Sequence, residues 1–345
     1  MAKLPLSGWQ ILAALITVSL LAPAVVHVQS PAGPGVFSVV TDAMLQDPAP
    51  EDWLMWRRTL DGWAYSPLDQ ITRDNVVDLR MVWTRAMIPG AQEGTPLIYN
   101  GVLYMPNPED AIQAIDAVTG DLKWEYRRDL PADVYEFTGD TARNNRNIAI
   151  YDRFIINTSD DNNVFALDAE TGEQTWRTYT VPGNPALGFE SEAMRLAAQT
   201  WFGTWWEGGG GGTVWDGVAF DPVADLLYVG TGNGSPWSRF YRSLGAGDNL
   251  YLSSILALNP DDGELVWYYQ TAPGDDWDYT AVQPMILADL VIDGEERQVL
   301  MQAPKNGFFY VLDRITGELL SAEAYAHVTW AYGIDLETGR PIEAP

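Results

Sequence analysis

The stretch that decides the fold is Ala114–Gly120 (AIDAVTG), which is followed by Trp124 and is repeated as Ala166–Gly172 (ALDAETG) followed by Trp176. In each copy an apolar strand ends at an Asp, and a Thr-Gly turn leads into a second strand that carries the tryptophan. The Asp and Thr side chains can cap the turn, and its glycine accepts a positive φ. We therefore expect an antiparallel hairpin at each copy, with its tryptophan packed against a neighbouring unit.

Three weaker copies follow the same pattern, at Ala257–Gly263 with Trp267, at Val311–Gly317 and at Ile334–Gly339. The turn glycines at positions 120, 172, 263, 317 and 339 are separated by 52, 91, 54 and 22 residues. A period of about fifty residues is typical of β-propeller blades, each a four-stranded antiparallel sheet. The sequence therefore predicts an all-β propeller. Only part of it is expected in this chain, which stops in the middle of a repeat.

Composition excludes several classes of function. Asp and Glu number 47 against 20 Lys and Arg, and the net charge of −27 would repel nucleic acid and anionic lipid. The chain has no cysteine and two histidines, His27 and His327, which excludes thiolate nucleophiles, zinc sites built on Cys or His, and attached c-type haem. Chemistry must therefore use carboxylates, amides, Lys, Arg or a bound cofactor.

The N-terminal segment predicts export. Residues 1–30 carry a single charged side chain, Lys3, before an apolar stretch from Ile11 to Val28, which indicates a signal peptide. An uncleaved membrane anchor is the alternative, because the apolar run is near the shortest length that spans a bilayer. A Pro-rich linker is expected at residues 31–50 and the partial propeller at residues 51–345. We expect a periplasmic protein with membrane contact only through its N-terminal segment.

Two features suggest a binding site for a flat ligand and a cation. Five glycines at 208–212 precede Thr213 and Trp215, so the backbone can approach a ligand closely while the indole offers a stacking face. A flexible loop and a core tryptophan are the simpler interpretations. Asn233, in Thr231–Gly234, can offer an amide oxygen to a hard cation, or it can be an ordinary turn residue.

Two further features carry charge. The segment Asp275–Tyr279 (DDWDY) crowds three carboxylates beside aromatic residues, and like charge with partial burial would raise a pKa towards that of a general base. Lys305, in Ala303–Gly307, is a cation suited to bind an anionic or carbonyl oxygen. A capping or surface role is the simpler interpretation of Asp278 and of Lys305.

Many short motifs of this chain resemble those of the PQQ-dependent methanol and ethanol dehydrogenases and occur in the same order. The resemblance extends from about Asp47 to the last residue. The segments that carry the resemblance are Trp53–Trp56, Tyr65–Leu68 with Asn75 and Val76, the Trp-ended repeats, Thr231–Trp237, Gly247–Tyr251, Trp277–Tyr279 and Lys305–Tyr310.

The resemblance implies an eight-bladed propeller of four-stranded, W-shaped blades that holds pyrroloquinoline quinone (PQQ) in its central funnel. It implies an oxidoreductase that converts an alcohol to an aldehyde or ketone, with PQQ as hydride acceptor and a metal ion as Lewis acid. By motif, it assigns Asp278 as catalytic base and metal ligand, Asn233 as metal ligand, and Glu93, Arg146, Thr213, Trp215 and Lys305 as cofactor contacts.

The resemblance also bears on the metal and the partners. In some relatives a second acid two positions after the catalytic Asp accompanies lanthanide use. Thr280 holds that position here, which favours calcium. The implied partners are a small alcohol substrate and a periplasmic electron acceptor such as a cytochrome c.

Two departures from the family pattern stand out. Gly139, Asp140 and Thr141 occupy the region where many relatives carry a vicinal cysteine pair. A blade that supplies a glutamate metal ligand is also expected to be deleted, because Trp176 runs directly into Tyr179–Gly183.

Without that glutamate, Asn233, Asp278 and the cofactor's own oxygens offer calcium fewer oxygens than it takes. Two alternatives to an active enzyme therefore stay open. One is a non-catalytic propeller scaffold, and the other is an inactive fragment of a quinoprotein dehydrogenase.

Overall fold

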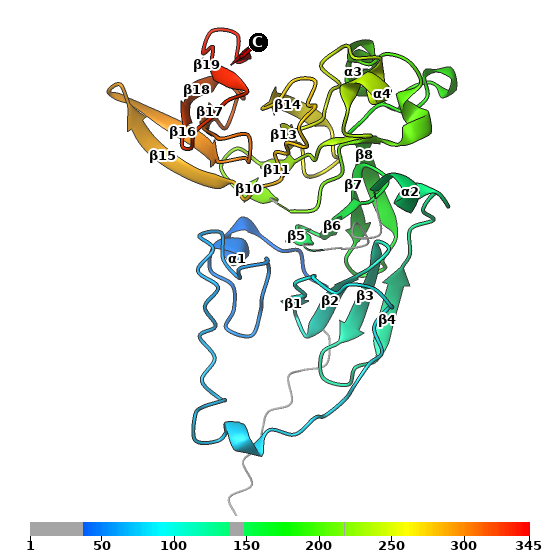
Figure 1. Ribbon diagram of the computed structural model, residues 1–345. Coiled ribbons are helices and arrows are strands. Elements are labelled where there is room, and N and C mark those ends of the chain that lie inside the picture. Colours follow the sequence, from blue (N-terminus) through cyan, green and yellow to red (C-terminus); the bar gives the residue numbers. More distant parts are fainter. Residues whose placement is uncertain (1–36, 139–145, 147, 217) are drawn as a thin grey trace, which may run out of the picture. The chain divides into compact units, whose positions relative to one another are not determined.

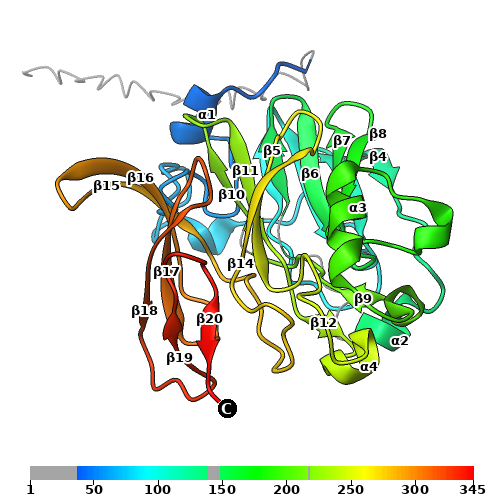
Figure 2. The same ribbon diagram turned by 90° about the horizontal axis from the view of Figure 1, so that it is seen from above.

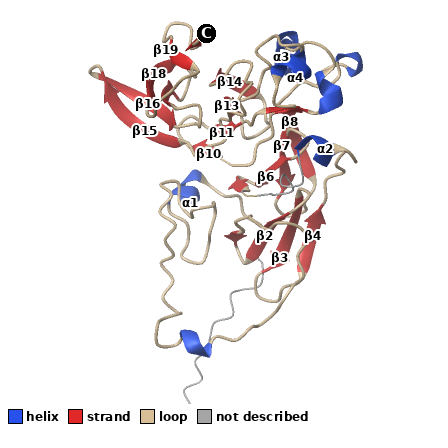
Figure 3. Cartoon of the chain, in the orientation of Figure 1, coloured by secondary structure: helices blue, strands red, loops and turns tan. Residues whose placement is uncertain are grey.

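The structure is a computed structural model that describes residues 37–345 apart from 139–145, 147 and 217. These residues form four antiparallel sheets of four strands, in which hydrogen-bonded neighbours follow one another in chain order (Figures 1 and 3). The predicted four-stranded units of a partial propeller are confirmed. The sheets consist of β1 (Leu97–Tyr99), β2 (Val102–Asn107), β3 (Ala111–Asp116) and β4 (Leu122–Tyr126); β5 (Ala149–Tyr151), β6 (Phe154–Ser159), β7 (Asn163–Asp168) and β8 (Gln174–Tyr179); β10 (Ala219–Asp221), β11 (Leu226–Gly230), β13 (Ser254–Leu258) and β14 (Leu265–Gln270); and β15 (Ile286–Ile292), β16 (Glu295–Gln302), β17 (Phe308–Asp313) and β18 (Leu319–Ala324).

One hairpin, one pair of short strands from distant segments and several short helices connect or follow the sheets. Within the described part of the chain, no helix has the length and apolar character needed to cross a membrane. The predicted signal segment at residues 1–30 lies outside the described residues. The additional elements are β9 (Gly210–Gly211) paired with β12 (Gly234–Ser235), β19 (Ala331–Ile334) paired with β20 (Pro341–Glu343), helices α1 (Asp42–Gln46), α2 (Val134–Thr138), α3 (Glu192–Ala197) and α4 (Arg239–Ser243), and 3-10 turns η1 (Val76–Asp78), η3 (Pro185–Leu187), η4 (Ala198–Thr200) and η5 (Trp205–Gly208).

The repeated stretch forms the hairpin that the sequence predicts. In the first copy, Asp116 Oδ1 accepts hydrogen bonds from the backbone N–H groups of Val118, at 2.9 Å, and Thr119, at 3.0 Å. Gly120 then turns the chain with a φ of +78°. The same capping recurs at Asp168, so each turn is held by a carboxylate and ends on a glycine in a conformation that other residues avoid.

Successive sheets are joined by the tryptophan of one and the turn glycine of the next. Trp124 Nε1 donates to Ala169 O at 3.1 Å, and a methyl group at Gly172 would lie 2.7 Å from the indole ring. The repeat therefore encodes the joint between sheets as well as the turn. Equivalent contacts join Trp176 to Gly263, with Nε1 donating to Pro260 O at 3.1 Å, and Trp267 to Gly317, with Nε1 donating to Arg314 O at 3.2 Å.

Trp83 makes the same contact although it belongs to none of the described strands. Its Nε1 donates to Ala117 O at 3.1 Å, and its ring covers Gly120, where a methyl group would approach it to 2.7 Å. The adjacent side chains of Met81 and Val82 are 81% and 85% exposed. Trp83 thus covers the turn of the first sheet as Trp124 covers the turn of the second, although Trp83 does not itself lie in a sheet.

The last copy of the repeat departs from the others. Its strands, β19 and β20, form a separate hairpin, and no tryptophan faces Gly339. Tyr269 of β14 takes that place instead, with its hydroxyl donating to Gly339 O at 2.9 Å. A hydroxyl group can replace the indole N–H as donor to the turn, so the turn keeps a partner although its strands join none of the four larger sheets.

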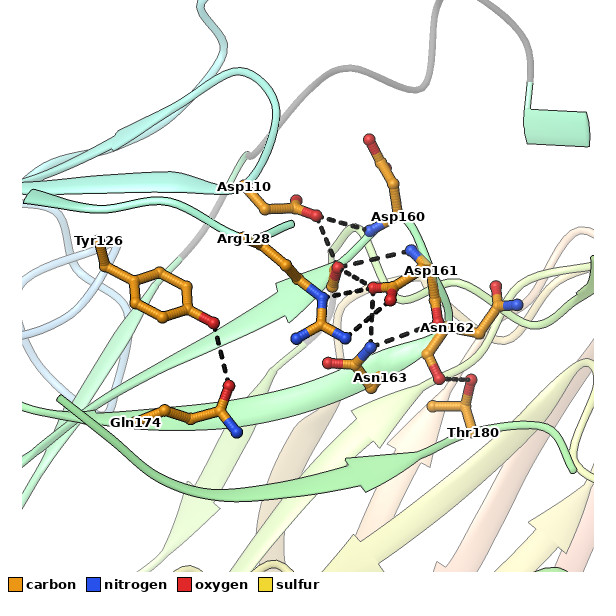
Figure 4. A network of polar contacts seen from close by, with 10 residues as sticks. Asp110, Tyr126, Arg128, Asp160, Asp161, Asn162, Asn163, Gln174 and Thr180 are labelled. Carbon is orange, nitrogen blue, oxygen red and sulfur yellow. Dashed lines mark hydrogen bonds and ion pairs between the residues drawn. The ribbon is translucent and has the colours of Figure 1, made fainter. Parts of the chain in front are cut away.

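A polar network joins the first and second sheets (Figure 4). Arg128 donates from Nε and Nη2 to the two carboxylate oxygens of Asp161, at 2.6 and 2.7 Å. The Ser159 hydroxyl lies between Asp161 and Asp110, 2.6 Å from Asp110 Oδ2. Burial raises the pKa of Asp110 to about 6. The network therefore connects the segment after β4 to the β6–β7 turn through one ion pair, and the β2–β3 turn to the end of β6 through a carboxyl group that binds a proton readily.

We predict that Gly172→Ala destabilises the joint between the first two sheets. The methyl group would lie 2.7 Å from the Trp124 ring, and Gly172 has a φ of +77°. Gly101→Ala is the matched control, because Gly101 has a φ of +74° and no atom within 4 Å of an added methyl group. Urea unfolding should show a loss about 1–3 kcal/mol larger for Gly172→Ala than for Gly101→Ala. Equal losses would contradict the proposed packing role.

Candidate functional site

The glycine run and the Asn233 turn are paired with each other. Strand β9 lies beside β12, and the Gly232 N–H donates to Thr213 O at 2.8 Å (Figure 2). A methyl group at Gly211 would lie 2.3 Å from Asn233 O. Gly211 is therefore required by the close approach of another protein segment. Neither a flexible loop nor a ligand contact, the two uses weighed from the sequence, accounts for Gly211.

This pairing places Trp215 over the Thr231–Gly234 segment. A methyl group at Gly232 would lie 2.3 Å from Cζ3 of the Trp215 ring. Trp215 and Thr213 are both partly exposed. Part of the indole packs against Gly232, and some of its surface stays accessible.

The loop that carries Asp278 lies beside the same segment. Ala281 N–H donates to Thr231 O at 2.9 Å, and a methyl group at Gly230 would lie only 1.8 Å from Ala281 O. Asp278 has a φ of +63°. The end of β11 therefore contacts the loop that carries Asp278 and continues directly into the Asn233 turn.

Asp278 and Lys305 form an ion pair in this region. Lys305 Nζ lies 3.3 Å from Asp278 Oδ2, and the two side chains are 46% and 33% exposed. An ion pair with this exposure contributes little to stability. Both groups therefore remain available to a ligand at small cost.

The raised pKa that the sequence predicts for the acidic cluster is found at Asp275. Burial raises the pKa of its carboxyl group to about 6, although Oδ1 accepts hydrogen bonds from Trp277 N–H at 3.0 Å and Tyr279 N–H at 3.2 Å. Asp275 is 1% exposed. It shapes the loop from within and does not face solvent.

Aromatic rings flank Asp278. Trp277 stacks on Tyr279 at a centroid distance of 5.6 Å, and both rings contact Trp330, at 5.2 and 5.5 Å. Trp330 Nε1 donates to Asn306 O at 2.7 Å, beside Lys305. Because Trp277 is 44% exposed, an apolar surface borders the ion pair.

Glu93 and Arg146 form a second, separate pair. Arg146 Nε donates to Glu93 Oε2 at 2.6 Å, and Thr95 N–H donates to Arg146 O at 2.9 Å. The hydrogen bonds that assemble the segments of Trp215, Asn233 and Asp278 do not include this pair. The flanking residues 145 and 147, and residues 139–141 where the cysteine pair was sought, lie outside the described residues.

The candidate metal ligands suit a hard cation in kind but fall short in number. Asn233 Nδ2 donates to Gly234 O at 3.1 Å, which leaves Oδ1 as an acceptor, and Asp278 offers a carboxylate. Calcium takes about six to eight oxygens. Across the described residues, no group of three or more His, Cys, Asp or Glu side chains is placed to hold a metal ion. These two side chains do not form a complete metal site by themselves.

Two buried polar residues near the site, Arg242 and Asn249, were not singled out from the sequence. They are 2% and 0% exposed. Both lie in or next to segments that carry the family resemblance, yet their type and spacing indicate no chemistry. Their burial, which is unusual for Arg and Asn, is the signal that identifies them, and it is visible only in the fold.

Comparison with known proteins identifies similar propellers. The model of the family described as glucose/ethanol/alcohol dehydrogenase, β-propeller domain, matches residues 53–175 and 183–323. The interruption lies where the sequence analysis expects a deleted blade. The quinohemoprotein alcohol dehydrogenase ADH IIB of Pseudomonas putida is 44% identical over 352 residues, covering 85% of this chain and 50% of that protein. The dehydrogenase subunit of the quinone alcohol dehydrogenase of Komagataeibacter europaeus is 40% identical, with 87% and 49% covered.

Solved structures give the same result. The quinohemoprotein alcohol dehydrogenase ADHIIG of Pseudomonas putida HK5 aligns with a TM-score of 0.64 and 41% identity, covering 89% of this chain and 53% of that one. The quinohemoprotein alcohol dehydrogenase of Comamonas testosteroni aligns with a TM-score of 0.63 and 37% identity, covering 88% and 53%. The chain spans about half the length of the curated relatives that it matches.

We predict that Asp275 makes stability depend on pH between about 4 and 6. The pKa of Asp275 is about 6 in the folded chain, above the ordinary 3.8. Its contribution to the free energy of unfolding is therefore full below pH 3.8 and is lost as the pH rises through 6. The unfolding free energy of the wild type, relative to Asp275→Asn, should therefore fall across this window, by on the order of 1–3 kcal/mol. Urea titrations of both proteins from pH 4 to 7 measure this difference, and a constant difference would contradict it.

Proposed function

The chain belongs to the glucose/ethanol/alcohol dehydrogenase β-propeller family, and from this premise we propose that it oxidises an alcohol to an aldehyde or ketone with PQQ as hydride acceptor. One observation supports the proposal most directly. Hydrogen bonds between distant segments bring Trp215 and Asn233 to the end of β11, beside the loop whose Asp278 pairs with Lys305. A scaffold has no need of this arrangement.

The residues present fit a flat, oxygen-rich quinone. Trp215 keeps accessible ring surface for stacking, and Thr213 lies beside it with a hydroxyl group. Lys305 supplies a cation for the quinone oxygens. We assign Glu93 and Arg146 to the polar edge of the cofactor, where the guanidinium would bind a carboxylate.

Asp278 is the proposed catalytic base. PQQ, when bound, supplies the hydride acceptor, and the chain must supply an acceptor for the proton of the substrate hydroxyl group. The Asp278 carboxylate is exposed enough for a small alcohol to reach it, and Lys305 at 3.3 Å balances its charge. The exposed Trp277 ring next to it offers a surface for the carbon part of the alcohol.

We propose calcium as the accompanying cation, in preference to a lanthanide. Asn233 and Asp278 offer oxygens of the type that calcium prefers. The position of a second acid is held by Thr280, which is buried and accepts a hydrogen bond from Gln283 Nε2 at 3.1 Å. A trivalent ion would therefore find less negative charge here than two carboxylates provide. The further oxygens of the shell must come from groups other than these two side chains.

The electron acceptor is proposed to be a cytochrome c in the periplasm. A 35% identical relative from Thauera butanivorans is named 1-butanol dehydrogenase (cytochrome c). The 345 residues described by the sequence contain no cysteine and therefore do not themselves attach a c-type haem.

The division of the chain into an export segment at residues 1–30, a linker at 31–50 and blades at 51–345 remains part of the proposal. Within the expected linker, Val40 N–H bonds Asp152 O at 2.8 Å and Leu45 is buried. The end of that segment therefore packs against the second sheet.

We predict that PQQ binds the purified protein in the presence of calcium and is released by chelator, as measured by titration calorimetry. Trp215→Ala should weaken binding about tenfold through lost stacking. Trp63→Ala is the control, because that ring is 76% exposed and lies outside the site. A folded wild type that does not bind PQQ would support a non-catalytic scaffold, and an aggregated one would support an inactive fragment.

We predict that Asp278→Asn lowers turnover by about 10²–10⁴, the usual contribution of a general base. PQQ affinity should change less than threefold, since the amide keeps the size of the side chain and still offers an oxygen to the cation. Asp276→Asn removes the neighbouring exposed carboxylate and serves as the control. Turnover is followed with an artificial electron acceptor. If Asp278→Asn abolished binding and turnover together, the assigned role would be wrong.

A further inference from the structure

Arg242 of α4 is buried and makes four hydrogen bonds to oxygens of three separate segments. Its Nη1 donates to Pro236 O at 2.7 Å and Trp237 O at 2.6 Å, and Nη2 donates to Asp275 O at 2.7 Å. Its Nε donates to Asn249 Oδ1 at 3.2 Å. One guanidinium therefore connects the turn that follows Asn233 to the first residue of the loop that carries Asp278.

The guanidinium also lies directly against the Asn233 turn. A methyl group at Gly234 would lie 2.2 Å from Arg242 Nη1 and 2.3 Å from Cζ. Glycine is thus needed at position 234 to let the cation reach the backbone. The contact fixes the residue that immediately follows Asn233.

On the other side, Asp275 carries the connection on to Asp278. Its Oδ1 accepts the N–H groups of Trp277 and Tyr279, the two residues that flank Asp278. The Ser253 hydroxyl donates to Tyr279 O at 2.6 Å. The backbone on both sides of Asp278 is therefore fixed to Asp275, and the Asp275 carbonyl is fixed to Arg242.

Burying the charged guanidinium of Arg242 costs more free energy than a purely structural contact requires. Burial lowers the pKa of its guanidinium to about 10 although the nearby Asp275 and Asp276 carboxylates favour the charged form, so it stays charged at neutral pH, yet its hydrogen-bond partners are carbonyl and amide oxygens. Arg314, also buried, pairs directly with the Asp221 carboxylate. A buried charge with neutral partners costs more free energy than a paired one. What only arginine offers at this position is a rigid fork of donors that spans several oxygens.

We propose that Arg242 is the positioning residue that holds Asn233 and Asp278 in register for the quinone and its cation. It acts through the 234–237 turn and through Asp275, and it touches no ligand. This inference rests on the proposed function for the identity of the ligand. The connection between the two loops does not depend on that identity.

Two variants and one control test the proposal. Arg242→Lys keeps the charge but loses the fork. Gly234→Ala keeps Arg242 and all its acceptors while the added methyl group displaces the guanidinium. Arg314→Lys is the matched control, a buried arginine of similar exposure in a joint between sheets. Each protein is measured for thermal unfolding, for PQQ affinity in calcium, and for amide hydrogen exchange in peptides covering residues 231–238 and 275–280.

All three variants should unfold at lower temperature than the wild type. Only Arg242→Lys and Gly234→Ala should raise the PQQ dissociation constant, about tenfold or more, and speed exchange about tenfold or more in both peptides. Arg314→Lys should leave both measurements within about twofold of the wild type.

The outcomes separate the two proposals. Unchanged exchange in either peptide of folded Arg242→Lys would overturn the inference, as would faster exchange with unchanged PQQ affinity. If a folded wild type binds no PQQ while both variants speed exchange in both peptides, the connection between the loops stands and the proposed function falls. A variant that does not fold leaves the decision to the other one. If neither folds, Arg242 is a requirement of the fold, and its assignment to the site is overturned.

Discussion

The contact between an indole ring and a turn glycine governs the arrangement of the sheets. A tryptophan such as Trp124 covers Gly172 so closely that no side chain fits there, and its N–H bonds the Ala169 carbonyl of the same turn. Ring burial supplies attraction, and the hydrogen bond supplies direction. Each joint fixes the separation and the angle of two sheets at once. The loops of the candidate site lie at strand ends, and their positions depend on these joints.

Close backbone approach also builds the candidate site. At Gly230, Gly232 and Gly234, the space of a side chain is taken respectively by Ala281 O, the Trp215 ring and the Arg242 guanidinium. Three segments can therefore converge on the end of β11 without intervening side chains. This arrangement leaves little freedom in the backbone, so the polar groups displayed on it keep their spacing while the exposed Asp278 and Lys305 side chains remain free to adjust.

The sequence predicted what is determined locally. The hairpin turns follow from Asp116 and Gly120, which interact within five residues, and the repetition of the pattern predicted the sheets and the role of the tryptophans. The copy at Ile334–Gly339 was expected to belong to a blade. It forms a separate hairpin, and because the preceding strand β18 carries no tryptophan, its Gly339 is covered by Tyr269, 70 residues away.

The candidate site was predicted less completely. Trp215, Asn233, Asp278 and Lys305 were singled out by their chemistry and given roles by family resemblance, and nothing in their spacing indicated that they meet. Their proximity depends on hydrogen bonds between segments tens of residues apart. Arg242 and Asp275, 33 residues apart, have no local pattern in common. The glycine run was also ambiguous, because the sequence does not show whether a ligand or another strand occupies the space that glycine leaves open.

The uniformity of the joints makes the sheets interchangeable units. Trp176 meets Gly263 across a sequence separation of 87 residues in the same way that Trp124 meets Gly172 across 48. Any sheet that carries such a turn before its last strand, and such a tryptophan in that strand, presents matching surfaces to any other. Gene rearrangements that remove or duplicate a whole repeat would therefore preserve packing while changing which polar side chains reach the centre. In this architecture, a single gene rearrangement can therefore leave the packing of the sheets intact and still remove catalytic activity.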